Sequence, residues 1–327
     1  MNTALAAPEA VGSDDPVGQL RLLSRLTAAF LLDTVAIVRG DDGHLIDTLL
    51  ISAATQANIA DVIRQPELQA AFADAVPPDE LRRPVSINAL AASLSLPFET
   101  VRRRIAGLAK SGHCVIVEGG VIVPGAVLSA PRYYADAFRG YERLRAFYYQ
   151  LRDQGLLTGL PPAETDLSQG PFPIRAVSRI AGAYVLRVVE LLASFGSVAD
   201  SMITMEVFRS NTERLPHSAR GGPGYDEMVG DEHRAPISVG ALARRVGMPP
   251  ETVRRHVGRL EGYGVIARVE GGLIVPTRFL ARPLLRRKLV ANAGNLQRMF
   301  ASLARLGVLE VWDGLPVIAP GSPGRPA

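Results

Sequence analysis

The chain has 327 residues, of which 47% are apolar and 21% charged, so it is long enough for two ordinary domains and its composition argues against general disorder. Its formal charge of +4 and its pI near 9.4 suit a nucleic-acid partner, although many enzymes have the same balance. The single cysteine, Cys114, excludes an internal disulfide, and the amino-terminal residues lack the basic start and apolar run of a signal peptide, so we expect a cytoplasmic protein that does not enter a membrane.

The first half of the chain predicts helices on both sides of a short β-rich segment. Apolar residues at helical spacing predict helices over 16–39 and about 45–64. A short helix, a turn and a longer helix follow. Two short β-rich runs then meet at Gly119-Gly120, which is a hairpin signal, and a long helix at about 131–155 comes last.

The same series returns in the second half. The segment that starts at Pro84 matches the segment that starts at Pro236 without a gap, 152 residues further along. A weaker match continues on both sides, and a period of this length indicates two copies of one unit. We therefore predict a mainly α fold of two pseudo-repeats, residues 1–158 and 159–327, in a pseudo-two-fold arrangement. The long helices of the second copy are expected, after a linker at 157–173, at 173–196, 199–213 and 283–307.

The repeated block has the pattern of two crossing helices followed by a hairpin. Gly247 can adopt the left-handed conformation that a sharp turn between helices requires, whereas the first copy has Ser95 there, a departure that costs up to about 1 kcal/mol. Pro250 suits the first turn of the second helix. The hairpins, at 113–124 and 264–276, stand where a wing belongs. The apolar residues that would face the core of the second block are Leu242, Val246, Val253, Val257 and Leu260.

This block resembles the winged helix-turn-helix regulators of bacteria over residues 84–124 and again over 236–276. Its Glu-Thr-Val-Arg-Arg run is similar to the recognition helices of the GntR-like and DeoR-like families. The long flanking helices look more like those of the MarR family, whose terminal helices form the dimer interface. The resemblance implies an internal dimer core built from the terminal helices of both copies. It also implies DNA contact by the threonine and the arginine after it, here Thr100, Arg102, Thr252 and Arg254.

The helical wheel gives the second helix of each block an outward face. Val101, Ile105 and Leu108 form an apolar stripe toward the core, so the opposite side can enter the major groove, where an arginine bonds O6 and N7 of a guanine together. Because the two outward faces differ, we expect related but unequal half-sites about 34–36 Å apart. Further candidates for DNA contact on these two helices are Glu99, Arg103, Arg104, Lys110, Glu251, Arg255, His256 and Arg259.

Two further clusters admit more than one interpretation. Cations after the second hairpin either contact phosphate or form a solvated surface; they are Arg278, Arg282, Arg286, Arg287 and Lys288. The tyrosines of the helix at 131–155 either line an effector pocket or pack between the two halves, and packing is the simpler interpretation. They are Tyr133, Tyr134, Tyr141, Tyr148 and Tyr149.

No group of residues predicts catalysis. His113 and Cys114 are adjacent, so in a strand their side chains point to opposite faces, which argues against a nucleophile pair. One polar loop lacks the usual spacing of metal ligands, although it contains His217, Asp226, Glu227, Asp231, Glu232 and His233. We therefore expect neither an enzyme, nor a cofactor, nor a bound metal.

These features predict a nucleoid-associated, sequence-specific transcriptional regulator that binds double-stranded DNA with two winged helices. It would act as a monomeric pseudo-dimer or as a homodimer, with a small-molecule effector as an additional partner. Two alternatives stay open: a plasmid-type replication initiator, and a tandem winged-helix scaffold for protein interactions. The repeated Thr-x-Arg-Arg argues against the scaffold, because such modules need no outward arginines.

Overall fold

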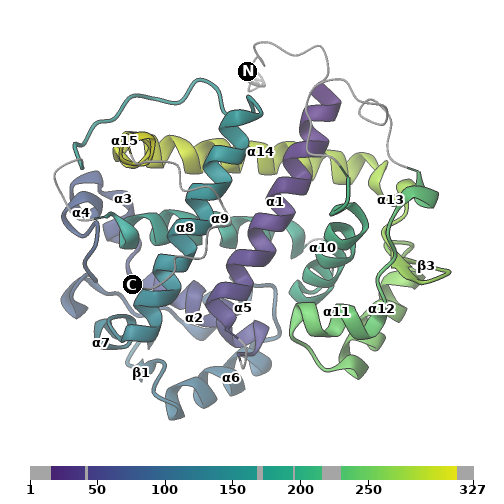
Figure 1. The fold of residues 1–327 in the computed structure, drawn as a ribbon. Helices are drawn as coiled ribbons and strands as arrows, with labels where there is room; N and C mark the ends of the chain where they lie inside the picture. Colours follow the sequence, from purple (N-terminus) through teal and green to yellow (C-terminus); the bar gives the residue numbers. More distant parts are fainter. Residues whose placement is uncertain (1–15, 41–42, 168–171, 194–195, 216–229, 315–327) are drawn as a thin grey trace, which may run out of the picture.

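The computed structural model describes residues 16–40, 43–167, 172–193, 196–215 and 230–314. The fold is mainly helical with two small antiparallel sheets (Figure 1). Among these residues, no helix has both the length and the apolar character that a membrane crossing needs. The elements up to Asp153 are α1 (Pro16–Arg39), α2 (Leu45–Asn58), α3 (Ala60–Arg64), α4 (Pro66–Ala71), η1 (Asp79–Leu81), α5 (Ile87–Ser93), α6 (Phe98–Lys110), β1 (Val115–Val117), β2 (Gly120–Ile122), α7 (Gly125–Leu128) and α8 (Pro131–Asp153).

The rest of the chain follows the same order of elements. It lacks counterparts of α3 and α4 among the residues described, and it adds one helix at the end. The elements are α9 (Ile174–Ala193), α10 (Val198–Thr212), η2 (Asp231–His233), α11 (Val239–Val246), α12 (Pro250–Gly262), β3 (Ala267–Val269), β4 (Gly272–Ile274), α13 (Thr277–Leu280), α14 (Pro283–Arg305) and α15 (Val308–Gly314). From η1 and η2 to α8 and α14, corresponding elements begin 152 residues apart.

Most of the predicted helices are present, and one is interrupted. The helix expected at 45–64 ends at Asn58, because Ile59 leaves the helical conformation, and α3 begins at Ala60 as a separate helix. The short helices α7 and α13 and the terminal helix α15 were not predicted. The part of the expected linker that the structure describes, 157–167 with 172–173, contains neither helix nor strand.

The turn between the two crossing helices has the predicted left-handed residue in both halves. Gly247 follows α11 with φ of 62°, and Ser95 occupies the corresponding position with φ of 51°. A serine in this conformation is strained, whereas glycine is not. The shape of the turn is therefore kept in the first half at some cost in free energy.

Each hairpin is completed by the segment before the first crossing helix. Val85 pairs with Val121 next to the β1–β2 hairpin, and Ile237 pairs with Leu273 next to β3–β4. A side chain at Gly120 would place its Cβ 2.1 Å from the Val85 carbonyl oxygen. Only glycine permits this close approach, which explains the Gly-Gly pair in the sequence.

A buried asparagine joins the end of α2 to its hairpin, and the same arrangement occurs at the end of α10. Asn58 donates to the carbonyls of Arg83 and Val121 and accepts from the amide of Val123. Asn211 makes the corresponding contacts with the carbonyls of Ala235 and Leu273 and with the Val275 amide. Both side chains are almost completely buried. In each half, one side-chain amide thus satisfies two backbone groups that would otherwise lack a partner and adds a second hydrogen bond to the carbonyl of Val121 or Leu273.

The two halves share one core. Helix α1 packs against α8 of its own half and against α10, while α9 packs against α14 and also against α2 and α8. At the centre, one fully buried aromatic ring comes from each of the four long helices α1, α8, α9 and α14: Phe30, Phe147, Tyr184 and Phe300. The Phe30 and Phe147 rings are stacked with centroids 4.5 Å apart.

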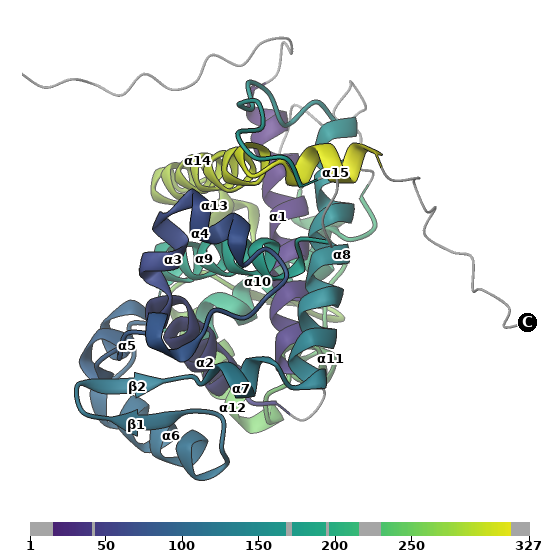
Figure 2. The same cartoon turned by 90° about the vertical axis from the view of Figure 1, so that its left-hand side faces the viewer.

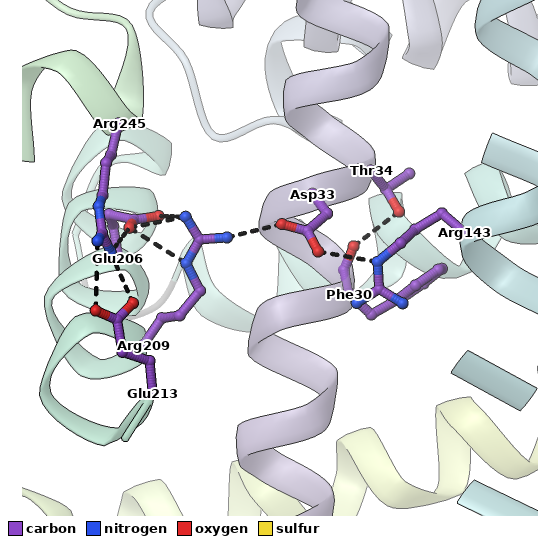
Figure 3. A network of polar contacts seen from close by, with 8 residues as sticks. All are labelled: Phe30, Asp33, Thr34, Arg143, Glu206, Arg209, Glu213 and Arg245. Atoms are coloured by element: carbon purple, nitrogen blue, oxygen red, sulfur yellow. Dashed lines mark hydrogen bonds and ion pairs between the residues drawn. The ribbon is translucent and has the colours of Figure 1, made fainter. Parts of the chain in front are cut away.

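A chain of ion pairs also crosses from one half to the other (Figure 3). Asp33 of α1 binds Arg143 of α8 at 2.9 Å and Arg209 of α10 at 2.8 Å. Arg209 also binds Glu206, which lies 3.3 Å from Arg245 of α11. The network thus connects a crossing helix of the second half to two long helices of the first.

Replacement of Asn58 or Asn211 by alanine tests whether the two asparagines stabilise the hairpins of the two halves to the same extent. Each variant leaves two backbone groups without a partner, because the carbonyl of Val121 or Leu273 still accepts from the amide of Val85 or Ile237, and we expect each to lower the free energy of unfolding by about 2 kcal/mol. The double variant should lose about the sum, since the two sites share no contacts. Urea unfolding followed by circular dichroism measures both. A loss below about 0.5 kcal/mol at either site would show that the hairpin does not depend on that amide.

Candidate nucleic-acid interface

The second crossing helix of each half, α6 or α12, is held by an apolar stripe and exposes the opposite side. Val101 and Ile105 are fully buried on α6, and Leu108 is half-buried. Val253, Val257 and Leu260 are buried on α12. These placements confirm the predicted stripe. Both helices lie at the lower end of the molecule in two views at right angles (Figures 1 and 2). The strands β1 and β3 lie at opposite outer edges in Figure 1.

Arg102 and Arg254, each two positions after the threonine, form an ion pair with a glutamate of the same helix. Arg102 forms a bidentate pair with Glu99, at 2.8 and 2.6 Å. These hydrogen bonds lower the pKa of Glu99, although both side chains are exposed. Arg254 and Glu251 form the corresponding pair on α12. The glutamate therefore holds the arginine in one orientation at the start of each helix.

The next arginine is exposed in both halves and has no ion pair in the part of the chain that the structure describes. Arg103 and Arg255 lie 152 residues apart on α6 and α12. Lys110, near the end of α6, is exposed as well, and Thr100 and Thr252 are half-buried in the first turns. A first-turn hydroxyl beside free backbone amides is suited to a phosphate oxygen.

Three other predicted DNA contacts are engaged with an aspartate on the preceding long helix. Arg104 binds Asp47 of α2 at 2.9 Å. On α12, His256 and Arg259 bind the two carboxylate oxygens of Asp200, at 2.7 and 2.6 Å. These side chains fix the orientation of α6 and α12 against α2 and α10. DNA contact by the three stays a prediction, and the structure gives them a role in packing that the sequence did not suggest.

Asp200 is the buried centre of its cluster. Its side chain is 3% exposed and also accepts from the Ser197 amide at 2.9 Å. Burial alone would raise the pKa of this carboxyl, but the hydrogen bonds from His256, Arg259 and Ser197 outweigh burial and hold the pKa well below its usual range. The carboxylate is therefore ionised throughout the neutral range.

Of the basic residues after the second hairpin, Arg282 contacts the C-terminal end of α12. Arg282 donates to the carbonyl of Tyr263 at 3.2 Å and lies over the Phe279 ring. Lys288 is half-buried. The remaining three are exposed: Arg278, Arg286 and Arg287.

Four of the five tyrosines of α8 contact residues of the second half. Tyr148 donates to Asp313 at 3.0 Å, and Tyr149 donates to the carbonyl of Trp312 at 2.6 Å, so both contact α15. The Tyr141 ring meets the Trp312 ring edge-on, and burial raises the pKa of Tyr141 to about 12. Tyr133 is half-buried, and the exposed Tyr134 ring stacks under the Arg175 guanidinium. An effector pocket at these tyrosines stays a prediction.

Two arginines near the C-terminal end of α11 were missed by the sequence analysis. The Arg39 guanidinium, at the end of α1, lies directly against Gly247, and Arg244 is exposed on α11. Both border an open cleft of about 460 Å³ between the end of α1 and the start of α12. The contact of Arg39 is between the two halves, so only the tertiary structure could place it there.

The loop considered for metal binding lies partly outside the described residues, which include Asp231, Glu232 and His233 but not His217, Asp226 or Glu227. In the described part, Asp231 accepts from the Thr277 amide at 2.7 Å and binds Arg234. The structure, as far as it describes the chain, brings no three metal-ligating side chains together. Asp231 therefore connects η2 to α13.

The second half contains a complete winged helix-turn-helix: α11, a left-handed turn, α12 and the β3–β4 hairpin. A family model described as winged helix-turn-helix DNA-binding matches residues 233–267, which run from η2 through α12 into β3. Comparison with curated proteins and with solved structures gives no match. The C-terminal winged helix-turn-helix thus points to DNA binding.

Replacement of Asp200 by asparagine tests how α12 is held. We expect a loss of about 2 kcal/mol at pH 7, because a charge-assisted pair is replaced by weaker hydrogen bonds. Since the pKa of Asp200 is depressed in the folded state, its stabilisation is present above about pH 4 and is lost as the pH falls through the folded pKa. The difference between the wild type and the variant should therefore be constant from pH 7 to about pH 4 and shrink below.

Urea unfolding at several pH values measures this difference. Asp61→Asn is the matched control, because Asp61 is half-exposed and pairs only with exposed arginines. Equal stability of the Asp200 variant and the control at pH 7 would contradict the assignment.

Proposed function

We propose that the protein is a sequence-specific transcriptional regulator that reads two related half-sites of DNA with α6 and α12. The observation that carries this proposal is the pair Arg103 and Arg255, exposed at the same position of both helices and without an ion pair among the described residues. An arginine fixed on a helix and left unpaired is available for a guanine edge in the major groove. A purely structural helix face gives no reason to keep it in both halves.

The arrangement of the two units supports simultaneous binding. The helices α6 and α12 share one end of the molecule while the hairpins lie on the outer sides (Figure 1). Such an arrangement suits consecutive major grooves on one face of a duplex, with half-site centres about 34–36 Å apart. Because Arg104 and Lys110 correspond to His256 and Gly262, the two half-sites would be related but unequal.

We infer that the chain is a tandem duplication that forms a pseudo-dimer. The constant offset of the elements, the two buried asparagines and the left-handed Ser95 and Gly247 support this inference. The shared core of α1, α8, α9 and α14 would then supply in one chain the interface that MarR-like proteins form from two.

The proposed contacts fall into two groups. Arg103, Arg255 and Lys110 face bases, while Thr100 and Thr252 bind phosphate. The residues proposed to add phosphate contacts around them are Arg39, Arg102, Arg244, Arg254, Arg278, Arg286 and Arg287. The hairpin tips carry Glu118 and Glu270, whose charge opposes phosphate, so the wings contribute little to the affinity.

The two alternatives would use the same surface differently. A replication initiator would bind iterated repeats at an origin rather than a promoter, and a protein-interaction scaffold would not need Arg103 or Arg255. We further propose that the protein acts in the cytoplasm and catalyses no reaction. Selection of bound fragments from genomic DNA distinguishes the two functions. Promoter fragments would favour the regulator, and iterated origin repeats would favour the initiator.

Replacement of Arg103 or Arg255 by alanine should each weaken binding to a selected DNA site by about 1–3 kcal/mol, which is about 5- to 150-fold in Kd, if each arginine pairs with a guanine. Fluorescence anisotropy measures the affinity, and footprinting should show protection lost at one half-site per variant. Arg305→Ala is the control, because Arg305 ends α14 and pairs with Glu164. Affinity losses of only a few tenths of a kcal/mol in both variants would reject the assignment.

The affinity for duplex DNA should fall steeply with salt, because each phosphate contact releases a counterion and adds about 0.9 to the slope of log K against log salt concentration. Removal of Arg244, or of Arg39, should lower the slope by about one while leaving the preferred sequence unchanged. A titration from low to physiological ionic strength measures the slope. A sample indifferent to DNA at low salt would favour the scaffold instead.

A further inference from the structure

The first strand of the first hairpin, β1, leaves apolar side chains on the surface. Val115, Ile116 and Val117 are 43%, 54% and 39% exposed, and they are consecutive β-branched residues. Single exposed apolar residues are ordinary on protein surfaces, whereas an uninterrupted run of three on one strand needs a reason. Among the described residues, β1 pairs only with β2, so its other edge is open.

The backbone of β1 offers a donor and an acceptor at this open edge. Val121 of β2 exchanges both of its backbone hydrogen bonds with Val85, so these groups turn away from β1. Ile116 lies opposite Val121. Because hydrogen-bonded pairs alternate with non-hydrogen-bonded pairs in antiparallel strands, the amide and the carbonyl of Ile116 point outward at the centre of the edge. An open edge of this kind is a template for a further strand.

The corresponding edge of the second half carries a charge. Arg268 of β3 stands where β1 has Ile116, and it pairs with Glu261 of α12 at 3.1 Å. The first half has Ala109 in place of Glu261, so an apolar surface replaces the ion pair. A charged residue on an edge strand protects it against pairing with another chain. That protection is present on β3 and absent from β1.

The sequence of β1 suits pairing with a second copy of itself. An antiparallel pair centred on Ile116 places Ile116 against Ile116 and Val115 against Val117, so every side chain of the strand meets an apolar one. The same arrangement of β3 would place Arg268 against Arg268, which is unfavourable because like charges lie opposite each other. A two-fold interface requires a surface that is complementary to itself, and β1 has this property.

The charges at the two ends of β1 also complement each other. Glu118 follows the strand at the hairpin tip, while Lys110 and His113 precede it. Antiparallel pairing brings each Glu118 to the end of the strand at which the other chain has its Lys110 and His113. The second half has Gly262 and Val265 at these two positions, so its hairpin lacks this complementarity.

We propose that β1 is a docking edge for a second copy of this chain, and that two chains join through an antiparallel β1–β1 pair about a two-fold axis. A three-residue strand with its flanks is too short to bury the ~1,600 Å² of a standard interface, so the dimer is weak and forms at high micromolar concentration. This pairing goes beyond the proposed function and does not depend on it, because it involves no DNA.

Sedimentation velocity of the DNA-free protein, from low micromolar to millimolar concentration, tests the proposal. The wild type should change from monomer to dimer over this range. Ile116→Arg, which copies the second half, should weaken self-association about tenfold or more, because two arginines then lie opposite each other. Val290→Arg is the matched control, since Val290 of α14 is 52% exposed, and it should leave self-association unchanged.

Cross-linking identifies the edge. In the proposed pair, the two thiols of the Ile116→Cys variant lie opposite each other on Cα atoms about 5.5 Å apart, so a short bis-maleimide should join the two chains. The native Cys114 is buried and should not react. Val290→Cys should give no covalent dimer under the same conditions.

The outcomes distinguish the docking edge from the proposed function. A wild type that stays monomeric at millimolar concentration, or that dimerises only when DNA is present, would overturn the docking edge. Self-association that Ile116→Arg leaves unchanged, or that Val290→Arg weakens equally, would overturn it as well, because the interface would then lie elsewhere. A protein that dimerises through β1 but does not bind DNA at low salt would remove the proposed function and leave the docking edge established.

Discussion

The orientation of α6 and α12 depends on a carboxylate in the first turn of the helix that precedes each unit. Each of these two helices buries only a narrow apolar stripe, and the adjoining strands have three residues each. Such contacts hold a helix to the core but leave its rotation weakly fixed. Asp47 and Asp200 add a directional constraint, because their ion pairs to Arg104, and to His256 and Arg259, have a fixed geometry. The exposed arginines of the same helices are therefore presented at defined angles.

Arginines have two different roles on α6. The role depends on whether the arginine pairs with a carboxylate of a neighbouring helix. Arg104 is half-buried against Asp47, whereas Arg103, its neighbour in the sequence, is exposed. Removal of an arginine of the first kind exposes a carboxylate without its partner, so the consequence is a loss of stability. Removal of one of the second kind leaves the fold unchanged and alters only what the surface can bind. Mutational data on this chain are interpretable once the two kinds are kept apart.

The shared core has consequences for how the two units can move. Aromatic rings in contact join the four long helices α1, α8, α9 and α14. The ion pairs around Asp33 and Glu206 connect α11 and α10 to α1 and α8 (Figure 3). Close-packed interiors shift between discrete arrangements rather than deform continuously. A displacement of α10 would therefore be transmitted to α1 and α8 of the first half.

The sequence by itself determined the local structure. Apolar spacing predicted the long helices, the Gly-Gly pairs predicted the hairpins, and the residue after α11 predicted the left-handed turn, because each depends on neighbours only a few residues away. The tertiary structure alone decided that Arg104, His256 and Arg259 turn toward the carboxylates of α2 and α10, that Arg39 lies on Gly247, and that the tyrosines of α8 meet α15. These contacts join residues far apart in the chain, and periodicity along a single helix carries no information about which distant side chain will cover it.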